Sequence, residues 1–542
     1  MIKISGYVVD VFKRTLEKGI VCVDNGKIVD ILPAQEVDMQ FIIPGFVDAH
    51  IHIESSMMLP SEFARYSLPH GTVACVCDPH EIANVCGVAG VDYMIDNASH
   101  SPLKFYFGAP SCVPATDFET SGAVLNEKDV EKLLERDEIH FLSEMMNFPG
   151  VVHGDEVVTH KLNAAKSANK PIDGHAPMLS GSDLEKYAQA GISTDHECMT
   201  LEEAEEKIAL GMNVLIREGS AAKNFDVLVP LLDKFPERIM FCSDDKHPDD
   251  LLKNGHIDAL VKRAIANGYD FFDVLRACSL HPVGHYKLDV GLLQVGDSAD
   301  FVVVDSLRDF HVKSTYIKGV KVAENGELTF PRFEPTALIN QFSAEKLNLD
   351  QLRVPVREGR LKVIEVEDGQ LTTKCVLAEP FVVDGCVVSD VQNDILKLVV
   401  YNRYQPSQPA IGFIKNVGIT KGALASTVAH DSHNIVAVGT SDEEIVAAIN
   451  HIISSQGGIV ACDGGRVELL PLPVAGLMSD LEGAEIALLY ETIDATAKEF
   501  GSTLNAPFMT LAFMSLLVIP ELKLSDKGLF DGLKFELVDI FG

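Results

Sequence analysis

A chain of 542 residues, of which 47% are hydrophobic and 23% charged, is long enough to bury a large core and is not dominated by disorder. Its formal net charge is −34, because 45 Lys and Arg residues stand against 79 Asp and Glu residues. Since such a surface repels phosphate backbones and anionic lipid, we expect no nucleic-acid and no membrane partner, and a small neutral substrate rather than a polyanion.

The start of the chain and the cysteines favour a cytoplasmic location. Residues 1–14 carry charge early and contain no apolar core of a signal peptide. No segment reaches the roughly 18 consecutive apolar residues of a membrane-spanning helix. The 11 cysteines are scattered without a C-x-x-C pair, which indicates reduced thiols rather than a disulfide framework.

Short strands are predicted on both sides of a long middle segment. The expected strands cover residues 4–9, 19–23, 27–31, 299–305 and 314–320. Asp24-Asn25-Gly26 is a strong tight-turn signal between two of them. We therefore expect one small β-sandwich domain, built from residues 1–43 and 286–335, with a larger domain inserted between these flanks.

The middle segment, residues 44–285, has the size and rhythm of one (β/α)8 barrel of the TIM type. Amphipathic stretches such as 155–168, 201–210 and 225–235 separate short apolar runs. A doubly wound open α/β sheet is the alternative, but the strand count favours a closed barrel. The eight expected strands cover residues 41–47, 72–77, 104–107, 140–143, 171–173, 192–194, 213–216 and 238–242.

The pattern changes again after about residue 335. Residues 360–366 and 371–377 are predicted to be strands, separated by the turn signal Asp368-Gly369. Residues 443–453 are predicted to form a helix, and a further strand begins at Gly457-Gly458. We expect residues 336–542 to form a C-terminal α+β domain.

The strongest local signal is His50-Ile51-His52 at the end of the first predicted barrel strand. Because residues two apart on a strand face the same side, both imidazoles can reach one metal ion. Barrel enzymes place their active sites at this end of their strands. Two solvated histidines are the alternative interpretation of this motif taken alone.

Further metal-competent side chains follow other predicted strands. Together with the two histidines, they form a mixed nitrogen and oxygen donor set that suits Mn²⁺, Fe²⁺ or Zn²⁺ better than Ca²⁺ or Mg²⁺. Six donors are too many for one catalytic metal and suit two metals that share a carboxylate. The six candidate ligands are His50, His52, Glu144, His175, His196 and Asp244.

This ordered set resembles the amidohydrolase superfamily and, within it, the bacterial-type adenine deaminases. Many members of the superfamily carry a carboxylated lysine after strand 4, whereas this chain has Glu144 there, which disfavours those branches. The resemblance covers nearly the whole chain. The segments that carry it are HIHIESSM (50–57), CDPHEIAN (77–84), SEMMN (143–147), DGHAP (173–177), TDHE (194–197), SDD (243–245), AHDSHN (429–434) and LPVAGLMS (472–479).

The resemblance implies hydrolysis of adenine to hypoxanthine and ammonia, as in purine salvage, by a metal-activated hydroxide at a binuclear Mn²⁺ or Fe²⁺ centre, with Zn²⁺ as a further option. It implies a bridging role for Glu144 and metal ligation by the other five donors. Two alternatives stay open: another aminopurine deaminase or cyclic-amide hydrolase of the superfamily, and a barrel that has lost catalysis and serves in an assembly. The second predicts a broken donor set, which this sequence does not have.

Several other residues near the strand ends are candidates for proton transfer or substrate binding. The expected catalytic residues are Asp244, Asp245, Glu54, Asp78 and His80. The expected substrate-binding residues are Glu81, Ser220 and Lys223. Each has a structural alternative: Glu81 as a first-turn helix carboxylate, Asp78 as an N-cap, His80 as a solvated residue and Gly219-Ser220 as a turn.

Two features of the C-terminal third bear on the site and on assembly. The H-x-x-H motif of His430 and His433 is a candidate to bind a further cation or to close over the barrel mouth, with a structural loop as the alternative. Residues 509–519 are apolar and weakly indicate a homodimer or a higher homo-oligomer, with core packing as the alternative.

Overall fold

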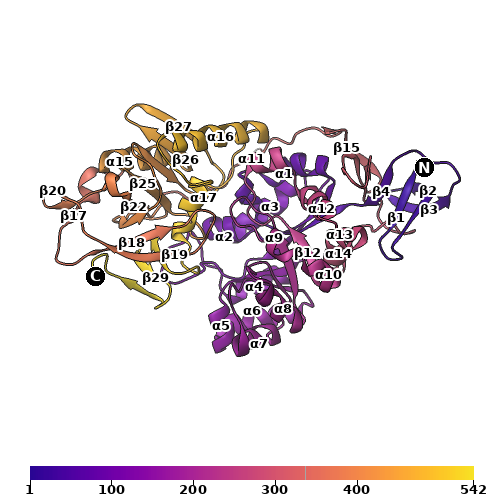
Figure 1. The fold of residues 1–542 in the computed structure, drawn as a ribbon, viewed down its shortest axis with the longest axis horizontal. Helices are drawn as coiled ribbons and strands as arrows, with labels where there is room; N and C mark the ends of the chain where they lie inside the picture. Colours follow the sequence, from indigo (N-terminus) through magenta and orange to yellow (C-terminus); the bar gives the residue numbers. More distant parts are fainter. Residues whose placement is uncertain (336) are drawn as a thin grey trace.

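The computed structural model describes residues 1–335 and 337–542. Three parts follow one another along the long axis of the molecule, with the barrel in the middle (Figure 1). The small β domain, which holds the N-terminus, and the C-terminal domain lie on opposite sides of the barrel. Among the described residues, no helix combines the length and the apolar character that a membrane crossing requires.

The predicted (β/α)8 barrel is confirmed. Backbone hydrogen bonds between the ends of the first and last strands close it, since Asp244 N donates to His50 O at 3.0 Å. The parallel strands are β5 (Phe46–Ile51), β6 (Thr72–Cys77), β7 (Lys104–Ala109), β8 (Ile139–Met145), β9 (Ile172–Gly174), β10 (Thr194–Asp195), β11 (Asn213–Arg217) and β12 (Ile239–Cys242).

Helices fill the connections between the barrel strands and pack their apolar faces against them. In the longer helices, apolar residues recur at helical spacing, so one side is buried and the other is exposed. They are α1 (Pro60–Ser67), α2 (His80–Cys86), α3 (Val88–Ala98), α4 (Glu127–Leu134), α5 (Phe148–His153), α6 (Glu156–Ser167), α7 (Gly181–Gln189), α8 (Leu201–Ala209), α9 (Phe225–Leu228), α10 (Leu231–Lys234), α11 (Pro248–Asn254), α12 (Ile257–Ala266), α13 (Phe271–Ala277) and α14 (Leu280–Tyr286).

Two predicted elements are each divided in the structure. The strand expected at residues 41–47 is split at Gly45 into β4 (Phe41–Pro44) of the small domain and β5 of the barrel. Gly45 packs so closely on Val73 that an added Cβ would lie 2.4 Å from that side chain. The helix expected at residues 225–235 is split into α9 and α10, because Pro230 has no N–H with which to continue the helix.

The small β domain is an eight-stranded sheet that uses both flanks of the barrel segment. The N-terminal β1 pairs with β4, which pairs in turn with β13 from the far flank, so the two flanks are joined inside one sheet. The order along the sheet is β16 (Glu327–Leu328), β15 (Val320–Glu324), β14 (Val312–Ile317), β13 (Phe301–Val304), β4, β1 (Ile2–Asp10), β2 (Thr15–Asp24) and β3 (Lys27–Pro33).

The C-terminal domain is built on a second eight-stranded sheet with helices on both faces. Side chains alternate along its strands, so Val399 and Ala437 face α15 (Asp442–Ser455) while Leu398 and Val438 face the opposite side. The order is β19 (Thr373–Ala378), β18 (Leu361–Val366), β23 (Ala410–Lys415), β22 (Ile395–Tyr401), β25 (Ile435–Gly439), β24 (Ala423–Ser426), β26 (Gly458–Asp463) and β27 (Arg466–Pro471). Two three-stranded sheets complete the domain: β17 (Val354–Pro355), β21 (Cys386–Val387) and β20 (Val382–Val383), and β28 (Leu522–Ser525), β29 (Gly528–Asp531) and β30 (Glu536–Val538).

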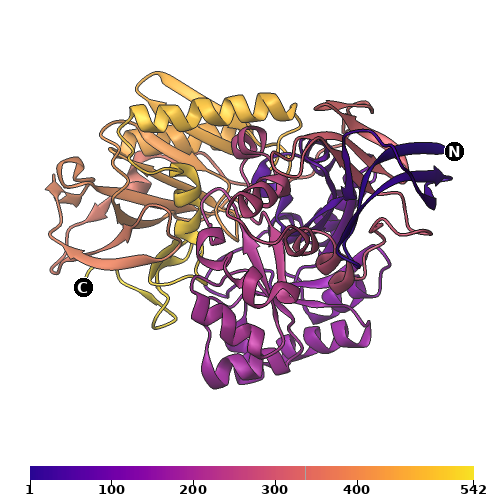
Figure 2. The ribbon, with the colours of Figure 1, turned by 45° about the vertical axis from the view of Figure 1, so that its right-hand side comes forward.

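The face of this sheet opposite α15 is joined to the barrel through one continuous core. Helix α16 (Gly483–Glu499) runs along the C-terminal domain toward the barrel (Figure 2), and α17 (Pro507–Ala512) lies beneath it. The apolar stretch 509–519 belongs to this core, since Met509 and Phe513 are buried within the chain. It therefore gives no support to an interface between copies of the chain, because internal packing accounts for its composition.

Candidate active site

A small pocket, with a cavity volume of about 30 Å³, lies where the carboxyl ends of the barrel strands meet the C-terminal domain. The barrel supplies its floor and one wall, and the C-terminal domain supplies the roof. The barrel residues that line it are His52, His80, Glu81, Glu144, Met146, His175, His196, Glu197, Arg217, Asp244 and Asp245. The residues from the C-terminal domain are Leu371, His430, Asp431, Phe513 and Leu516.

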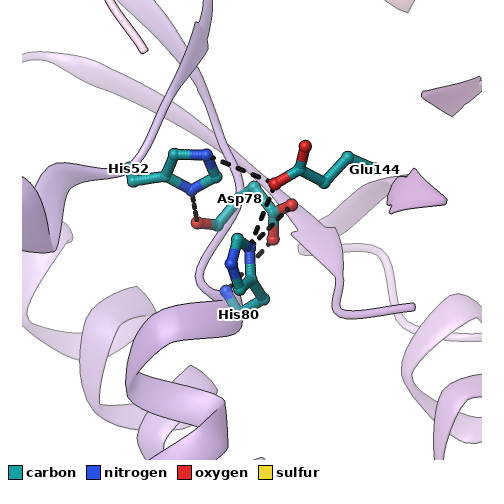
Figure 3. A group of neighbouring side chains, drawn as sticks. All are labelled: His52, Asp78, His80 and Glu144. Carbon is teal, nitrogen blue, oxygen red and sulfur yellow. Dashed lines mark hydrogen bonds and ion pairs between the residues drawn. The ribbon is translucent and has the colours of Figure 1, made fainter. Parts of the chain in front are cut away.

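The two histidines of the H-x-H motif lie at the end of β5, and His52 lines the pocket. The backbone carbonyl of Asp78 accepts a hydrogen bond from His52 Nδ1 at 3.1 Å, which leaves the lone pair on His52 Nε2 (Figure 3). That lone pair faces Glu144 Oε1 and Asp244 Oδ1, each at 3.4 Å. A lone pair aimed at two carboxylates is repelled by both unless a cation lies between them.

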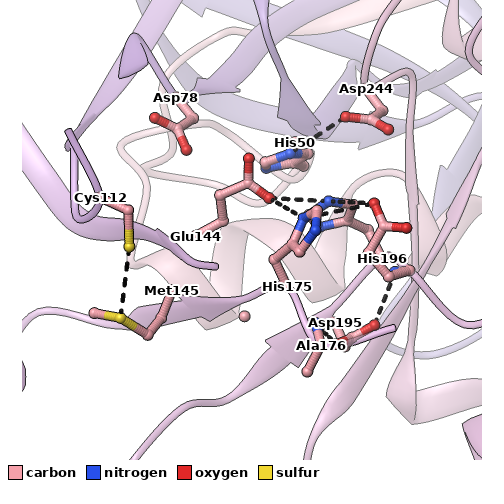
Figure 4. Close-up of polar contacts among 12 residues, drawn as sticks. His50, Asp78, Cys112, Glu144, Met145, His175, Ala176, Asp195, His196 and Asp244 are labelled. Atoms are coloured by element: carbon pink, nitrogen blue, oxygen red, sulfur yellow. Dashed lines mark hydrogen bonds and ion pairs between the residues drawn. The ribbon is translucent and has the colours of Figure 1, made fainter. Parts of the chain in front are cut away.

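Glu144, at the end of β8, is the centre of the donor cluster. Its Oε2 lies 2.8 Å from His175 Nδ1 and 3.1 Å from His196 Nε2, while its Oε1 faces the H-x-H motif (Figure 4). Burial alone would raise the pKa of Glu144, but His175 and His196 outweigh it and hold that pKa well below its ordinary value. One carboxylate thus faces both halves of the cluster.

The donors present fit a pair of divalent cations. His50 Nε2 and His52 Nε2 lie only 3.1 Å apart, at 3.5 and 3.4 Å from Asp244 Oδ1. Two groups that share His196 each bring their ligand atoms within 4.8 Å of one another: His50, His196 and Asp244, and Glu144, His175 and His196. Such buried polar atoms are costly without partners, and bound cations would satisfy them. The structure therefore brings all six predicted ligands together.

Asp244 occupies a strained backbone position at the end of β12. Its φ is +55°, a left-handed conformation, and its amide and carbonyl bond back to β5. Asp244 Oδ2 accepts a hydrogen bond from Arg217 Nη1 at 2.6 Å, which leaves Oδ1 to face His50 and His52. Burial would raise the pKa of Asp244, but Arg217 holds it well below the ordinary value.

Sequence analysis missed Arg217 and Glu197. Arg217, the last residue of β11, forks its guanidinium between Glu197 and Asp244, and all three side chains are buried. Glu197 Oε1 also lies 3.3 Å from His196 Nε2 and 3.6 Å from His175 Nδ1. An inward-facing arginine at the end of a barrel strand was the available signal for this pair.

The other expected catalytic residues surround the donor cluster, some of them lining the pocket and others lying behind its wall. Asp245 and His80 line the pocket, and Ser55 donates a hydrogen bond to Asp245. Asp78 orients His80, since its Oδ2 lies 3.2 Å from His80 Nδ1. Glu54 lies behind the pocket wall, where it accepts a bond from Ile82 N, and burial raises its pKa to about 7.

Only one of the three expected substrate-binding residues lies at the pocket. Glu81 lines the pocket, but Ser220 and Lys223 do not. The chain turns back after β11, and the Ser220 hydroxyl is occupied by Asp250 Oδ2 at 2.6 Å and by the amide of His247 at 2.9 Å. Lys223 is largely exposed beside Glu218. The turn alternative therefore describes this segment, and neither Ser220 nor Lys223 lines the pocket in this structure.

The C-terminal domain reaches the pocket through the H-x-x-H loop. His430 and His433 both contact Glu81, on opposite oxygens of its carboxylate. Asp431, between them, lies 3.8 Å from His80 Nε2. The H-x-x-H loop thus lies against the barrel mouth, and its two histidines and Glu81 are also close enough to hold a cation.

The fold and the donor cluster define a metal-dependent hydrolase of the amidohydrolase class, and comparison with known proteins agrees. Residues 41–322 match the Amidohydrolase family, which spans the barrel and its return into the small β domain. Residues 370–536 match the adenine deaminase C-terminal domain. The chain belongs to the amidohydrolase family and, within it, to the adenine deaminases.

Relatives align with the chain over its whole length. An adenine deaminase of Methanosarcina mazei is 51% identical and covers 100% of both chains. One of Salinibacter ruber is 53% identical over 99% of this chain and 98% of its own. One of Borreliella burgdorferi is 45% identical over 99% of this chain and 100% of its own. The resemblance drawn from the motifs is confirmed.

Proposed function

We propose that this chain hydrolyses adenine to hypoxanthine and ammonia, as its relatives' name implies. The observation that carries the proposal is the buried donor cluster at the mouth of an amidohydrolase barrel, beneath a C-terminal domain of the adenine deaminase type. Imidazoles and carboxylates line the barrel side of the pocket, and these groups suit a polar nitrogen heterocycle.

In the proposed mechanism, two divalent cations would be held by His50, His52, Glu144, His175, His196 and Asp244. When bound, such ions lower the pKa of a coordinated water and supply a nucleophile at neutral pH. Asp244 Oδ1, which faces the cluster, accepts the proton of the attacking water, while Arg217 holds the other oxygen of the same carboxylate.

The remaining proton steps belong to residues that line the pocket. Attack at C6 of adenine breaks ring conjugation, so the adjacent ring nitrogen gains a proton and the amino group leaves as ammonia. Asp245 and His80 are the proposed carriers, since each lines the pocket beside the donor cluster. Asp78 orients His80. Glu54, behind the wall, contributes to the charge of this region without reaching the substrate.

Mn²⁺ or Fe²⁺ is the proposed metal, with Zn²⁺ as a further option. Four imidazoles with two carboxylates are the mixed donor set that these ions share. Elemental analysis of protein produced with each metal, beside turnover, tests this choice.

Adenine should be hydrolysed far better than adenosine. Leu371, Phe513 and Leu516 line the pocket from the C-terminal domain, so a ribose on the purine would have to fit against these apolar side chains. Ammonia release from adenine, adenosine and hydantoin measures this directly and separates the function from that of other amidohydrolases. Comparable kcat/KM for adenine and adenosine would contradict the prediction.

We also propose a homodimer or a higher homo-oligomer in the cytoplasm, acting in purine salvage. The support is general: closed symmetric assemblies are the common state of oligomeric enzymes, and none of the cysteines described by the structure is paired. Light scattering at micromolar protein should give a multiple of the 59.0 kDa chain mass. A mass equal to one chain would refute the assembly.

A further inference from the structure

A buried carboxylate of the barrel is held by two histidines of the C-terminal domain. Glu81 lies in the first turn of α2, where its Oε1 contacts His430 Nδ1 at 2.5 Å and its Oε2 contacts His433 Nε2. All three side chains are almost fully buried, with exposed fractions of 2%, 4% and 1%. This contact joins two domains at the wall of the pocket.

The tautomer of His433 distinguishes a hydrogen-bonded group from a metal site. The backbone amide of Ala429 donates a hydrogen bond to His433 Nδ1 at 3.2 Å, so the Nδ1 lone pair is occupied. The proton of the neutral ring is then on Nε2, from which it is donated to Glu81. A metal ion would need the Nε2 lone pair. The three residues therefore form a hydrogen-bonded group rather than a third metal site, although their donor atoms lie close enough for one.

His430 is held in a single orientation by this arrangement. Its ring stacks on Phe513 with centroids 4.8 Å apart and an interplanar angle of 18°, and its Nδ1 is engaged by Glu81. Burial opposes the charged form, but Glu81 raises the pKa of His430 to about 9, which favours a protonated ring with a donor on each nitrogen. His430 lines the pocket, and its Nε2 has no hydrogen-bond partner within the described part of the chain.

We propose that His430 is a substrate-binding residue supplied by the C-terminal domain, and that its Nε2–H donates a hydrogen bond to a ring nitrogen of the bound purine. Glu81 and His433 are positioning residues, which fix the tautomer and orientation of His430. The inference rests on the proposed adenine deaminase function. It gives the C-terminal domain a part in substrate binding: without the domain, the pocket lacks its roof and one donor.

Two substitutions of His430 separate its two nitrogens. His430→Asn places an amide near the position of Nδ1, so it can keep the bond to Glu81 but cannot reach the purine. His430→Gln places an amide N–H near the position of Nε2. We expect His430→Asn to lower kcat/KM for adenine about 10- to 100-fold, the usual cost of losing a charge-assisted hydrogen bond. His430→Gln should lose less, and both should keep the wild-type metal content.

His451→Asn is the matched control, because His451 lies on α15 away from the pocket. It should leave kcat/KM and metal content unchanged. If His430→Asn loses metal in parallel with activity, the residue has a structural role and the proposal is wrong. A loss in His430→Gln as large as that in His430→Asn would also overturn it.

Binding of deaza analogues identifies the contact independently of turnover. Calorimetry with 1-deaza-, 3-deaza-, 7-deaza- and 9-deazaadenine should show that one analogue binds wild type and His430→Asn equally, because it lacks the nitrogen that His430 contacts. The other three should bind the variant about 10- to 100-fold more weakly. Equal weakening for all four analogues excludes a specific hydrogen bond. If wild type binds the analogues but releases no ammonia from adenine, the proposed function fails while the binding result still decides the role of His430.

Discussion

Replacement of Glu144 by glutamine should remove at least one metal equivalent and abolish activity. Glu144 is the carboxylate that faces both His52 and the pair His175 and His196. An amide keeps the shape but removes the negative charge between two dications, and its oxygen is a much poorer bridging ligand. Elemental analysis beside kcat, on protein protected from chelators, should show about two metals per chain in wild type and at most one in the variant.

Glu138→Gln is the matched control, since Glu138 is exposed just before the same strand. It should leave the metal content and kcat unchanged. If Glu144→Gln retains two tightly bound metals and near-normal turnover, Glu144 is not the bridge. One metal per chain in a fully active wild-type enzyme would likewise contradict the assignment of a binuclear centre.

Asp244→Asn should fail in a different way, with most of the metal retained and kcat lowered by about 10²–10⁴-fold. The four histidines and Glu144 still provide donors, but the group proposed to take the proton of the attacking water is gone. The substitution removes one of the two carboxylates that Arg217 contacts, but the guanidinium keeps its pairing with Glu197. Metal stoichiometry and kcat on the same preparations test the prediction.

Asp245→Asn, at the neighbouring residue, is the variant with which the Asp244→Asn result is compared. Asp245 lines the pocket and accepts a bond from Ser55, so the substitution should disturb the metal content less than either Glu144→Gln or Asp244→Asn. A loss of both metals in Asp245→Asn would place this carboxylate among the ligands. If Asp244→Asn keeps wild-type kcat, the proton acceptor must be another residue.

The sequence by itself determined the barrel and the donor cluster, because both follow local rules. Side chains alternate along a strand, so His50 and His52 face the same side. The carboxyl ends of the parallel strands lie at one rim of the barrel, so Glu144 and Asp244 can be placed near these histidines even when the loop conformations are unknown. The motifs also identified the family, because their order along the chain is specific even where each is short.

Only the tertiary structure decided which side chains beyond the strand ends reach the pocket. After β11 the chain turns back, so Ser220 faces Asp250 while Arg217, still on the strand, points inward. No local pattern reports this choice, because the direction of a loop depends on what packs against it. His430 meets Glu81 across 349 positions of sequence, and that contact exists only because the apolar face of the C-terminal sheet docks on the barrel. Burial of that shared core is the physical reason that a distant domain closes the site.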